Sequence, residues 1–305
     1  MKPLIRRRFF TISAAACVMP RFASASVPTA TWRGIALGAH AQMQIAGLSQ
    51  GDAQPVFEKV EAEINRLEDI FSLYRPSSVL NRLNQFGKVA VPPPELLELC
   101  SVCASIHAAT NGAFDPTVQP LWSAMARGAD ASELEQVKSL VGWQGFRFDS
   151  NLIRFDRTGM ALTFNGIAQG YIADRVALIM RRVGLIDLVI NTGEIMALGR
   201  RGDGQAWRAG VRGLDGIEIL ARIDLVDRAL ATSAPMGSTI GASGATHILD
   251  PRTGVQKVNG RIVSVSADKA AIADGLSTAF TIMKPSEIEG TLRVFDQAKL
   301  EYRSL

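Results

Sequence analysis

Two short runs in the C-terminal third of the chain combine residue types that can do chemistry. The run A-T-H-I-L-D-P-R-T-G places His247 three residues before Asp250, in a strip that ends in a turn of proline and glycine. The run A-D-G-L-S-T places Asp274 and Thr278 four residues apart, on one face of a helix. Oxygen ligands in that arrangement suit a hard cation such as Mg²⁺, which keeps positions open for phosphate oxygens and water. The two runs together predict phosphoryl or nucleotidyl transfer.

The first 25 residues are predicted to be an export signal. The run R-R-R-F-F that starts at Arg6 fits the twin-arginine pattern, an apolar stretch covers residues 9–19, and Ala23-Ser24-Ala25 resembles a cleavage site. The apolar stretch is too short for a permanent membrane anchor. Cys17 lacks the leucine three positions earlier that usually accompanies lipid attachment, so we expect cleavage, no lipid anchor and a periplasmic protein.

Cleavage changes the charge of the chain. Residues 1–25 carry five cationic and no acidic side chains, so the mature chain has a formal net charge of −1 instead of +4. A nearly neutral chain gives no case for nucleic-acid binding. The remaining residues, 26–305, are enough for one large domain with a substantial core.

Cys100 and Cys103 are the only cysteines of the mature chain. They repeat at helical spacing with Leu96, Leu97 and Ile106. A redox or metal-binding C-x-x-C motif is the alternative, but mid-helix geometry disfavours a disulfide and the sequence offers no second ligand pair nearby. We therefore expect buried core thiols.

Helix patterns dominate the first half of the chain and strand patterns the second. Helices are predicted at residues 55–71, 92–111, 131–141, 167–183 and 270–283. Strands are predicted at residues 34–47, 160–164, 187–191, 195–198, 207–211, 217–223, 230–232, 261–266 and 300–303, with a hairpin at 145–155. This segregation predicts an α+β fold with antiparallel strands mainly in the C-terminal half, not a regularly alternating doubly wound sheet.

The chain resembles the ApbE family of FAD:protein FMN transferases over residues 32–303, because seven short motifs occur in the family's order. They are L-G-A at 37–39, F-S-L-Y-R-P-S-S at 71–78 with L-N-R-L-N at 80–84, G-A-F-D-P-T-V at 112–118, G-I-A-Q-G-Y at 166–171, A-T-S at 231–233, H-I-L-D-P-R-T-G at 247–254 and A-D-G-L-S-T at 273–278. The resemblance implies an ApbE-like fold and one transferase domain over residues 26–305. It also implies a reaction in which FMN leaves FAD and joins a threonine hydroxyl of an acceptor protein through a phosphoester, with release of AMP.

The same resemblance implies two sets of binding residues. The positions that match FAD contacts are Leu37, Tyr74, Ala113, Phe114, Asp115, Asn165, Tyr171 and Leu249. The positions that match Mg²⁺ ligands are Ala168 through its carbonyl, Asp274, Ser277 and Thr278. An aromatic ring such as that of Tyr74 can stack on a flavin without any demand for hydrogen bonds. The metal would neutralise the pyrophosphate and stabilise charge on the departing AMP.

His247 and Asp250 are the candidate catalytic residues. A neutral His247 imidazole could take the proton of the acceptor hydroxyl, and Asp250 could orient the site or act as the base itself. The sequence does not decide between these roles, and an aspartate before Pro251 is also a common turn former. The other histidines are expected to be structural, His40 in a strand and His107 near a helix end.

Three segments depart from the family pattern, and one of them is Ala234-Pro235-Met236, which follows A-T-S where glycine and an aromatic residue are common. Gln169 stands where many members have a charged residue, often lysine, which removes one phosphate contact. The turn Thr192-Gly193-Glu194 has one glycine where relatives often have two, so we expect a tighter loop near the flavin.

Two other functions would use the same residues. The first is a Mg²⁺-dependent FAD pyrophosphatase, in which water replaces the acceptor hydroxyl and the products are FMN and AMP. The second is a non-enzymatic, exported flavin-binding or assembly protein, although the intact Asp274, Thr278 and His247 argue against it.

The acceptor of such a transferase is expected to carry an S/T-G-A-T-like motif, and a membrane-bound redox protein is one candidate. This chain itself reads S-G-A-T at 243–246, directly before His247. Thr246 is therefore a candidate self-acceptor, and the alternative is a chance Gly/Ser-rich loop.

Overall fold

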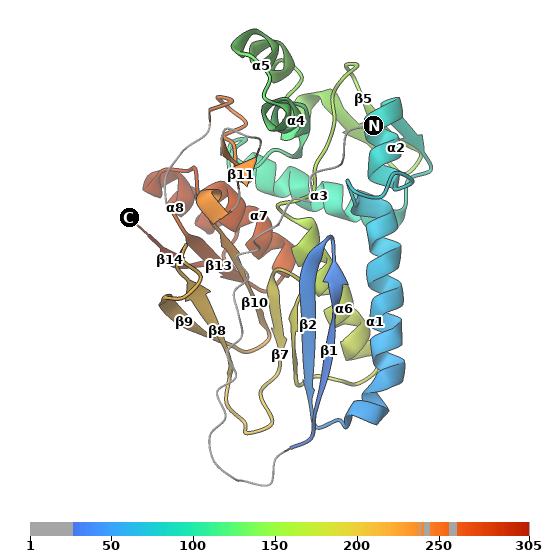
Figure 1. Ribbon diagram of the computed structural model, residues 1–305, viewed down its shortest axis with the longest axis vertical. Coiled ribbons are helices and arrows are strands. Elements are labelled where there is room, and N and C mark those ends of the chain that lie inside the picture. Colours follow the sequence, from blue (N-terminus) through green and yellow to red (C-terminus); the bar gives the residue numbers. More distant parts are fainter. Residues whose placement is uncertain (1–26, 238, 241–244, 256–260, 305) are drawn as a thin grey trace.

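An antiparallel sheet of seven strands forms the centre of the molecule (Figure 1). The computed structural model describes residues 27–237, 239–240, 245–255 and 261–304, so the predicted export signal at 1–25 lies outside the described residues. The strand order is β1-β2-β6-β7-β10-β13-β14, and each neighbouring pair is antiparallel. The strands are β1 (Thr29–Ala36), β2 (Ala39–Ala46), β6 (Leu188–Asn191), β7 (Ile195–Leu198), β10 (Arg228–Ser233), β13 (Val263–Ala267) and β14 (Lys299–Arg303).

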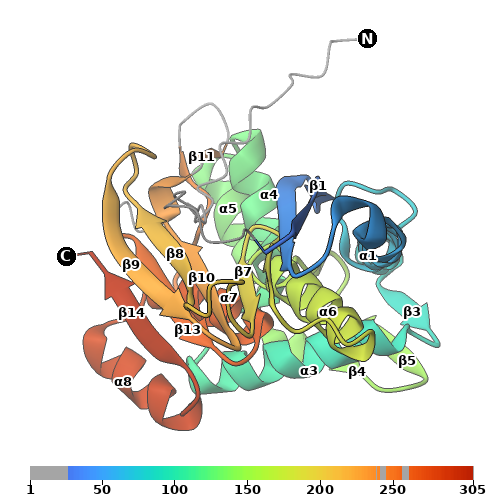
Figure 2. The same ribbon diagram turned by 90° about the horizontal axis from the view of Figure 1, so that it is seen from below.

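Both faces of the central strands are covered (Figure 2). The covering elements are α6 (Ala168–Arg182) and α7 (Ala270–Phe280) on one face and the hairpin of β8 (Trp207–Arg212) and β9 (Ile219–Leu225) on the other. Successive side chains of a strand point to opposite faces. Leu188 and Ile190 accordingly join the main core under the helices, whereas Val189 packs with Trp207 and Leu225 of the hairpin. The near-continuous apolar sequence of these strands follows from this double coverage.

Two long helices complete the scaffold around α6 and α7. α1 (Gln50–Phe71) runs beside β1 and α6 and buries the stripe that includes Val60, Ile64 and Leu67. The Ser49 side chain caps this helix by accepting a hydrogen bond from the Asp52 N–H at 3.2 Å. α3 (Pro94–Ala109) packs against α7 on the side away from the sheet.

Shorter elements surround this scaffold. They are α2 (Val79–Phe86), β3 (Lys88–Ala90), η1 (Pro116–Val118), α4 (Gln119–Arg127), α5 (Ala131–Lys138), η2 (Trp143–Gly145), β4 (Phe146–Phe148), β5 (Leu152–Phe155), η3 (Pro235–Gly237), β11 (Thr239–Ile240), β12 (Ala245–Thr246) and α8 (Pro285–Val294). Strands β3, β5 and β4 form a small sheet, and β11 pairs with β12.

The α+β fold with an antiparallel sheet is confirmed, and so are the long helices and the hairpin at 145–155. Two strand predictions were wrong. Residues 34–47 contain a hairpin, not one strand, and the chain reverses at Leu37, whose φ is +49°, and Gly38. Residues 160–164 form no strand, because the Leu162 N–H donates to the Asn84 side chain and the Thr163 N–H to the Pro116 carbonyl. Helices α2, α4 and α8 were not predicted.

Cys100 and Cys103 are free and fully buried in α3, as predicted. Burial raises the pKa of both thiols well above the ordinary value. Both therefore belong to the core. Within the described part of the chain, we find no helix with the length and apolar character needed to cross a membrane.

Candidate active site

The predicted metal ligands lie where α7 meets the start of α6. Asp274 is 3% exposed, and its Oδ2 accepts a hydrogen bond from the Gly170 N–H at 3.2 Å. The Ser277 hydroxyl is fully buried and donates to the Asp274 carbonyl at 3.0 Å. Thr278 lies one residue further along α7 and faces the segment before α6, since a Cβ on Gly166 would be 3.0 Å from its Oγ1. The structure therefore brings these predicted ligands to the segment that contains Ala168.

Glycine at position 170 allows this close approach. A Cβ at Gly170 would lie 2.3 Å from the Ala270 carbonyl oxygen, which is shorter than any real contact. Asp174, one turn further along α6, accepts hydrogen bonds from the Ala270 and Ala271 N–H groups at 2.7 and 3.0 Å. Asp174 thus binds the unpaired N–H groups at the start of α7, and this contact sets the position of the helix that carries Asp274.

The end of β10 adds a third hydroxyl to the cluster. Ser233, from the A-T-S motif, has its Oγ 2.7 Å from Ser277 Oγ and 3.3 Å from Thr278 Oγ1. Three hydroxyls and one buried carboxylate therefore gather from β10 and α7. This is a hard, oxygen-rich set of donors.

Burial controls the electrostatics of this cluster. Burial raises the pKa of Asp274 to about 7 and that of Asp174 to about 6. Glu194, in the turn between β6 and β7, is 8% exposed. Its pKa is also raised, first by burial and then by the negative charge of Asp274. Sequence reasoning named Glu194 only as part of a short turn and did not foresee that it lies beside Asp274.

The strip that contains the candidate catalytic residues crosses between η3 and α4. His247 Nδ1 is 3.1 Å from the Pro235 carbonyl oxygen, and the Trp122 indole N–H donates to the His247 carbonyl at 3.2 Å. Pro235 lies two residues after Ser233, so the imidazole is anchored to the segment that directly follows the hydroxyl cluster. Leu249 is 5% exposed.

Asp250 has a different environment. It is 2% exposed, and its two carboxylate oxygens accept hydrogen bonds from Arg252 Nε and Nη2, each at 2.9 Å. Arg252 also pairs with Glu287 at 3.0 Å. The backbone carbonyl of Asp250 accepts from the Thr253 and Gly254 N–H groups. These contacts favour the turn-forming interpretation of Asp250 over a role as the base.

Two predicted FAD contacts are connected through one ion pair. The Leu37 N–H donates to Glu68 Oε1 at 2.6 Å, and Arg75 pairs with the other oxygen of Glu68. Arg75 follows Tyr74, which is 57% exposed, and also pairs with Asp69 at 2.7 Å. The Glu68–Arg75 pair therefore places the turn of the β1–β2 hairpin next to an exposed aromatic ring.

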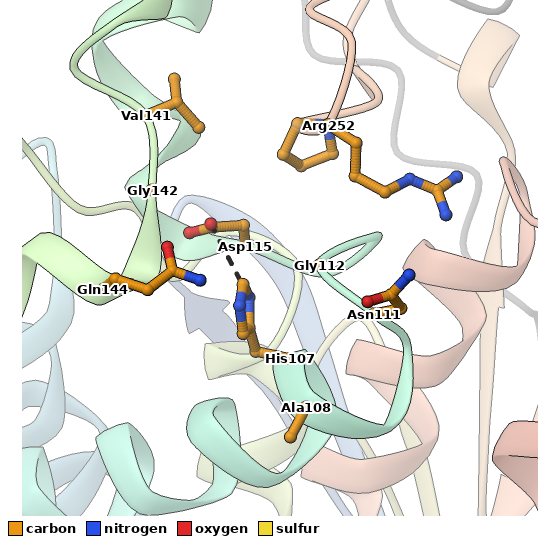
Figure 3. Close-up of a pocket in the computed structure, with 10 residues that line it drawn as sticks. His107, Ala108, Asn111, Gly112, Asp115, Val141, Gly142, Gln144 and Arg252 are labelled. Atoms are coloured by element: carbon orange, nitrogen blue, oxygen red, sulfur yellow. Dashed lines mark ion pairs between the residues drawn. The ribbon is translucent and has the colours of Figure 1, made fainter.

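A cavity of about 450 Å³ opens beside the H-I-L-D-P-R-T-G run at 247–254, which contributes Pro251 and Arg252 to its lining (Figure 3). Its lining includes His107 from the end of α3, Asp115 from the G-A-F-D motif and Arg252. Asp115 accepts hydrogen bonds from the Thr117 N–H and hydroxyl and from the Trp143 N–H, so it holds the cavity wall in place. Ala113 and Phe114 are buried beside it.

Comparison with known proteins decides which family has this arrangement. The family model described as the ApbE family matches residues 37–301, which is most of the chain. The chain belongs to the ApbE family. It is similar to the FAD:protein FMN transferase of Klebsiella pneumoniae, with 24% identity over 281 residues that cover 85% of this chain and 80% of the relative. It is similar to that of Vibrio cholerae, with 27% identity over 249 residues that cover 76% and 74%.

Solved structures of the family have the same fold. The flavin transferase ApbE from Vibrio cholerae superposes with a TM-score of 0.77 at 22% identity, covering 91% of this chain and 97% of the other. The Pseudomonas stutzeri flavinyl transferase ApbE, in its apo form, superposes with a TM-score of 0.76 at 25% identity, covering 90% and 89%.

Two other residues predicted by resemblance to the ApbE family, Asn165 and Tyr171, have different degrees of exposure. Asn165 is exposed in the turn before α6. Tyr171 is 3% exposed, its ring lies edge-on to Phe71, and its hydroxyl donates to Glu98 at 2.6 Å. Tyr171 therefore packs between α1, α3 and α6, and its contact with FAD stays a prediction.

The structure also shows the surroundings of His107 and Thr246. His107 has the structural role expected of it, since its Nδ1–H donates to the Phe114 carbonyl at 3.0 Å and its ring stacks on Trp143. It also lines the cavity, which was not predicted. Thr246 is fully buried in β12, and its hydroxyl donates to the Ile248 carbonyl at 3.3 Å. Ser243 and Gly244 of the S-G-A-T run lie outside the described residues.

Proposed function

We propose that this chain transfers FMN from FAD to a threonine hydroxyl of an acceptor protein and releases AMP. Membership of the ApbE family and the similarity to FAD:protein FMN transferases support this function. The observation that carries it is the meeting of Asp274, Ser277 and Thr278 of α7 with Ser233 and with the start of α6. These residues come from three of the family's motifs, and together they would hold a cation and the pyrophosphate of FAD.

The donor set fits Mg²⁺ better than a transition metal. Among the described residues, no three His, Cys, Asp or Glu side chains are grouped as a metal site. A cation would therefore be held by the Asp274 carboxylate, the hydroxyls of Ser277 and Thr278 and the carbonyl of Ala168, with substrate oxygens and water. When bound, Mg²⁺ would neutralise the pyrophosphate and stabilise charge on the AMP leaving group.

His247 is the better placed of the two candidate bases. The Pro235 carbonyl can only accept a hydrogen bond, so His247 Nδ1 must be protonated, and Nε2 of the neutral ring carries the lone pair. Nε2 takes the proton of the threonine hydroxyl as its oxygen bonds to the FMN phosphorus, and the bond from that phosphorus to the AMP oxygen breaks. Asp250 would support this step by holding the strip through Arg252.

The acceptor and the compartment are part of the same proposal. Residues 1–25 have the features of a twin-arginine signal, which supports a mature periplasmic enzyme. The acceptor would present an S/T-G-A-T-like segment, and a membrane-bound redox protein is a candidate of suitable chemistry. The proposed partners are FAD and the acceptor protein, and they include no nucleic acid.

The test is to incubate the protein with FAD, Mg²⁺ and a candidate acceptor that carries such a segment. We expect an acceptor whose intact mass increases by one FMN, with an equal amount of AMP. The acceptor with valine in place of its threonine is the control and should gain no mass. Release of free FMN and AMP without any modified acceptor would favour the pyrophosphatase and overturn the transferase. FAD that binds and stays intact would overturn both enzymes.

A further inference from the structure

Glu194 is a buried acid to which the proposed reaction assigns no part. It ends the turn between β6 and β7, and the Thr192 N–H donates to its carbonyl at 3.0 Å. The Thr192 hydroxyl donates to the Gln169 carbonyl at 3.0 Å. A Cβ on Gly193, whose φ is +109°, would lie 2.5 Å from the Gln169 side chain. The turn is therefore pressed against the start of α6, beside the predicted carbonyl ligand Ala168.

The side chain of Glu194 points toward the hydroxyl cluster. Its Oε2 accepts a hydrogen bond from the Thr232 N–H at 3.2 Å. The next residue is Ser233, whose hydroxyl meets Ser277 and Thr278. Asp274 reaches the same place from α7, since its Oδ2 accepts a hydrogen bond from the N–H of Gly170, the residue after Gln169, against which the Glu194 turn is pressed.

The two carboxylates have little that compensates their charge. Among the described residues, one backbone N–H donates to each carboxylate, and no ion pair involves either side chain. Asp250, which is equally buried, is paired bidentately with Arg252. Two adjacent buried carboxylates without a cationic partner are costly unless they share a proton or a bound cation.

We propose that Glu194 is a second acidic residue of the cation site, opposite Asp274. This inference rests on the proposed function, because that function supplies the cation. Glu194 lies on the side of the site formed by β10 and the β6–β7 turn, whereas Asp274, Ser277 and Thr278 lie on α7. A cation between the two carboxylates would be held by both sides, so it would also tie the sheet to α7.

The test measures cation binding without FAD. Metal-free wild-type protein and the Glu194→Gln variant are titrated with Mg²⁺ by calorimetry, and thermal unfolding is followed with and without Mg²⁺. Glutamine keeps the size of the side chain and an oxygen for the Thr232 N–H. We expect Mg²⁺ to bind the variant about 10-fold more weakly or worse, since loss of even an outer-shell partner of a metal site typically costs about 10–100-fold in affinity. Glu301→Gln on β14 is the control for loss of a largely buried acid away from the cluster, since Glu301 accepts a hydrogen bond from the Ser266 hydroxyl at 2.7 Å, and this variant should keep its Mg²⁺ affinity within about threefold.

The unfolding curves with and without Mg²⁺ distinguish a cation ligand from a purely structural residue, because the substitution should change stability differently in the two conditions. Without Mg²⁺ the Glu194→Gln variant should be at least as stable as the wild type, because one of two repelling carboxylates is gone. With Mg²⁺ it should gain less stability than the wild type. Equal Mg²⁺ affinity and equal Mg²⁺-dependent stabilisation in both proteins would overturn the proposal and indicate a shared proton. If the wild type binds Mg²⁺ more tightly than Glu194→Gln but modifies no acceptor, the proposed function is wrong and the role of Glu194 in cation binding is still supported.

Discussion

The substitution Gly170→Ala tests whether the spacing of α6 and α7 determines both stability and activity. The added Cβ would lie 2.3 Å from the Ala270 carbonyl oxygen and 2.5 Å from its carbon, where ordinary contacts begin at 3.4 Å. The clash is with backbone atoms, so no side chain can rotate away, and the two helices must separate by about 1 Å. Such overpacking costs roughly 1–3 kcal/mol, partly offset by up to about 1 kcal/mol of better helix propensity.

We therefore expect a midpoint of thermal unfolding that is lower by on the order of 5 °C, since 1 kcal/mol corresponds to about 2–4 °C in a domain of this size class. The separation also stretches the Gly170–Asp274 hydrogen bond. A 1 Å misplacement in a catalytic site can cost on the order of 10²-fold in rate, so FMN transfer should fall steeply.

The matched control is Gly290→Ala in the middle of α8, where the nearest atom to a new Cβ is the end of Arg293 at 3.9 Å. This variant should be slightly more stable than the wild type and equally active. Thermal unfolding and the rate of FMN transfer are measured for both. If Gly170→Ala is as stable and as active as Gly290→Ala, the tight contact between α6 and α7 does not position the site.

Three further predictions follow from the site. Asp274→Ala should abolish FMN transfer without unfolding the protein, and Ser277→Ala should reduce it less, because water can replace a neutral hydroxyl; equal losses in transfer assays would contradict this order. His247→Ala should slow transfer by about 10²–10⁴-fold at unchanged FAD affinity, as loss of a general base does, and a weakened affinity at full rate would make it a binding residue only. The pKa of Asp174 is raised to about 6 in the folded protein, so the folded state binds the proton more tightly than the unfolded state, and stability must fall as the pH rises from about 4 to about 6. Asp174→Asn should remove this part of the fall, by up to about 1.4 kcal/mol per pH unit, in denaturant unfolding between these pH values, and parallel curves for both proteins would refute it.

Periodic patterns in the sequence were sufficient to predict the long helices and which face of each helix is buried. The stripe of Val60, Ile64 and Leu67 predicts α1, and the spacing of Cys100 and Cys103 predicts two core thiols in α3. Short helices such as α2, α4 and α8 were missed, because eight to ten residues carry too few turns for a periodic signal. The β1–β2 hairpin was missed because Leu37 occupies a left-handed conformation that usually indicates glycine or asparagine.

The motifs allowed the family and the candidate site residues to be predicted from the sequence alone, including the helical face that carries Asp274 and Thr278. Only the tertiary structure decided which groups meet: Ser233 with Ser277 across 44 positions, Arg252 with Asp250 and Glu287, and Glu194 with the Thr232 N–H. The physical reason is that a local repeat determines which way a side chain points from its own element. Proximity between elements, and the burial that raises a carboxylate pKa, depend on how closely those elements pack, which here depends on the missing side chain of Gly170.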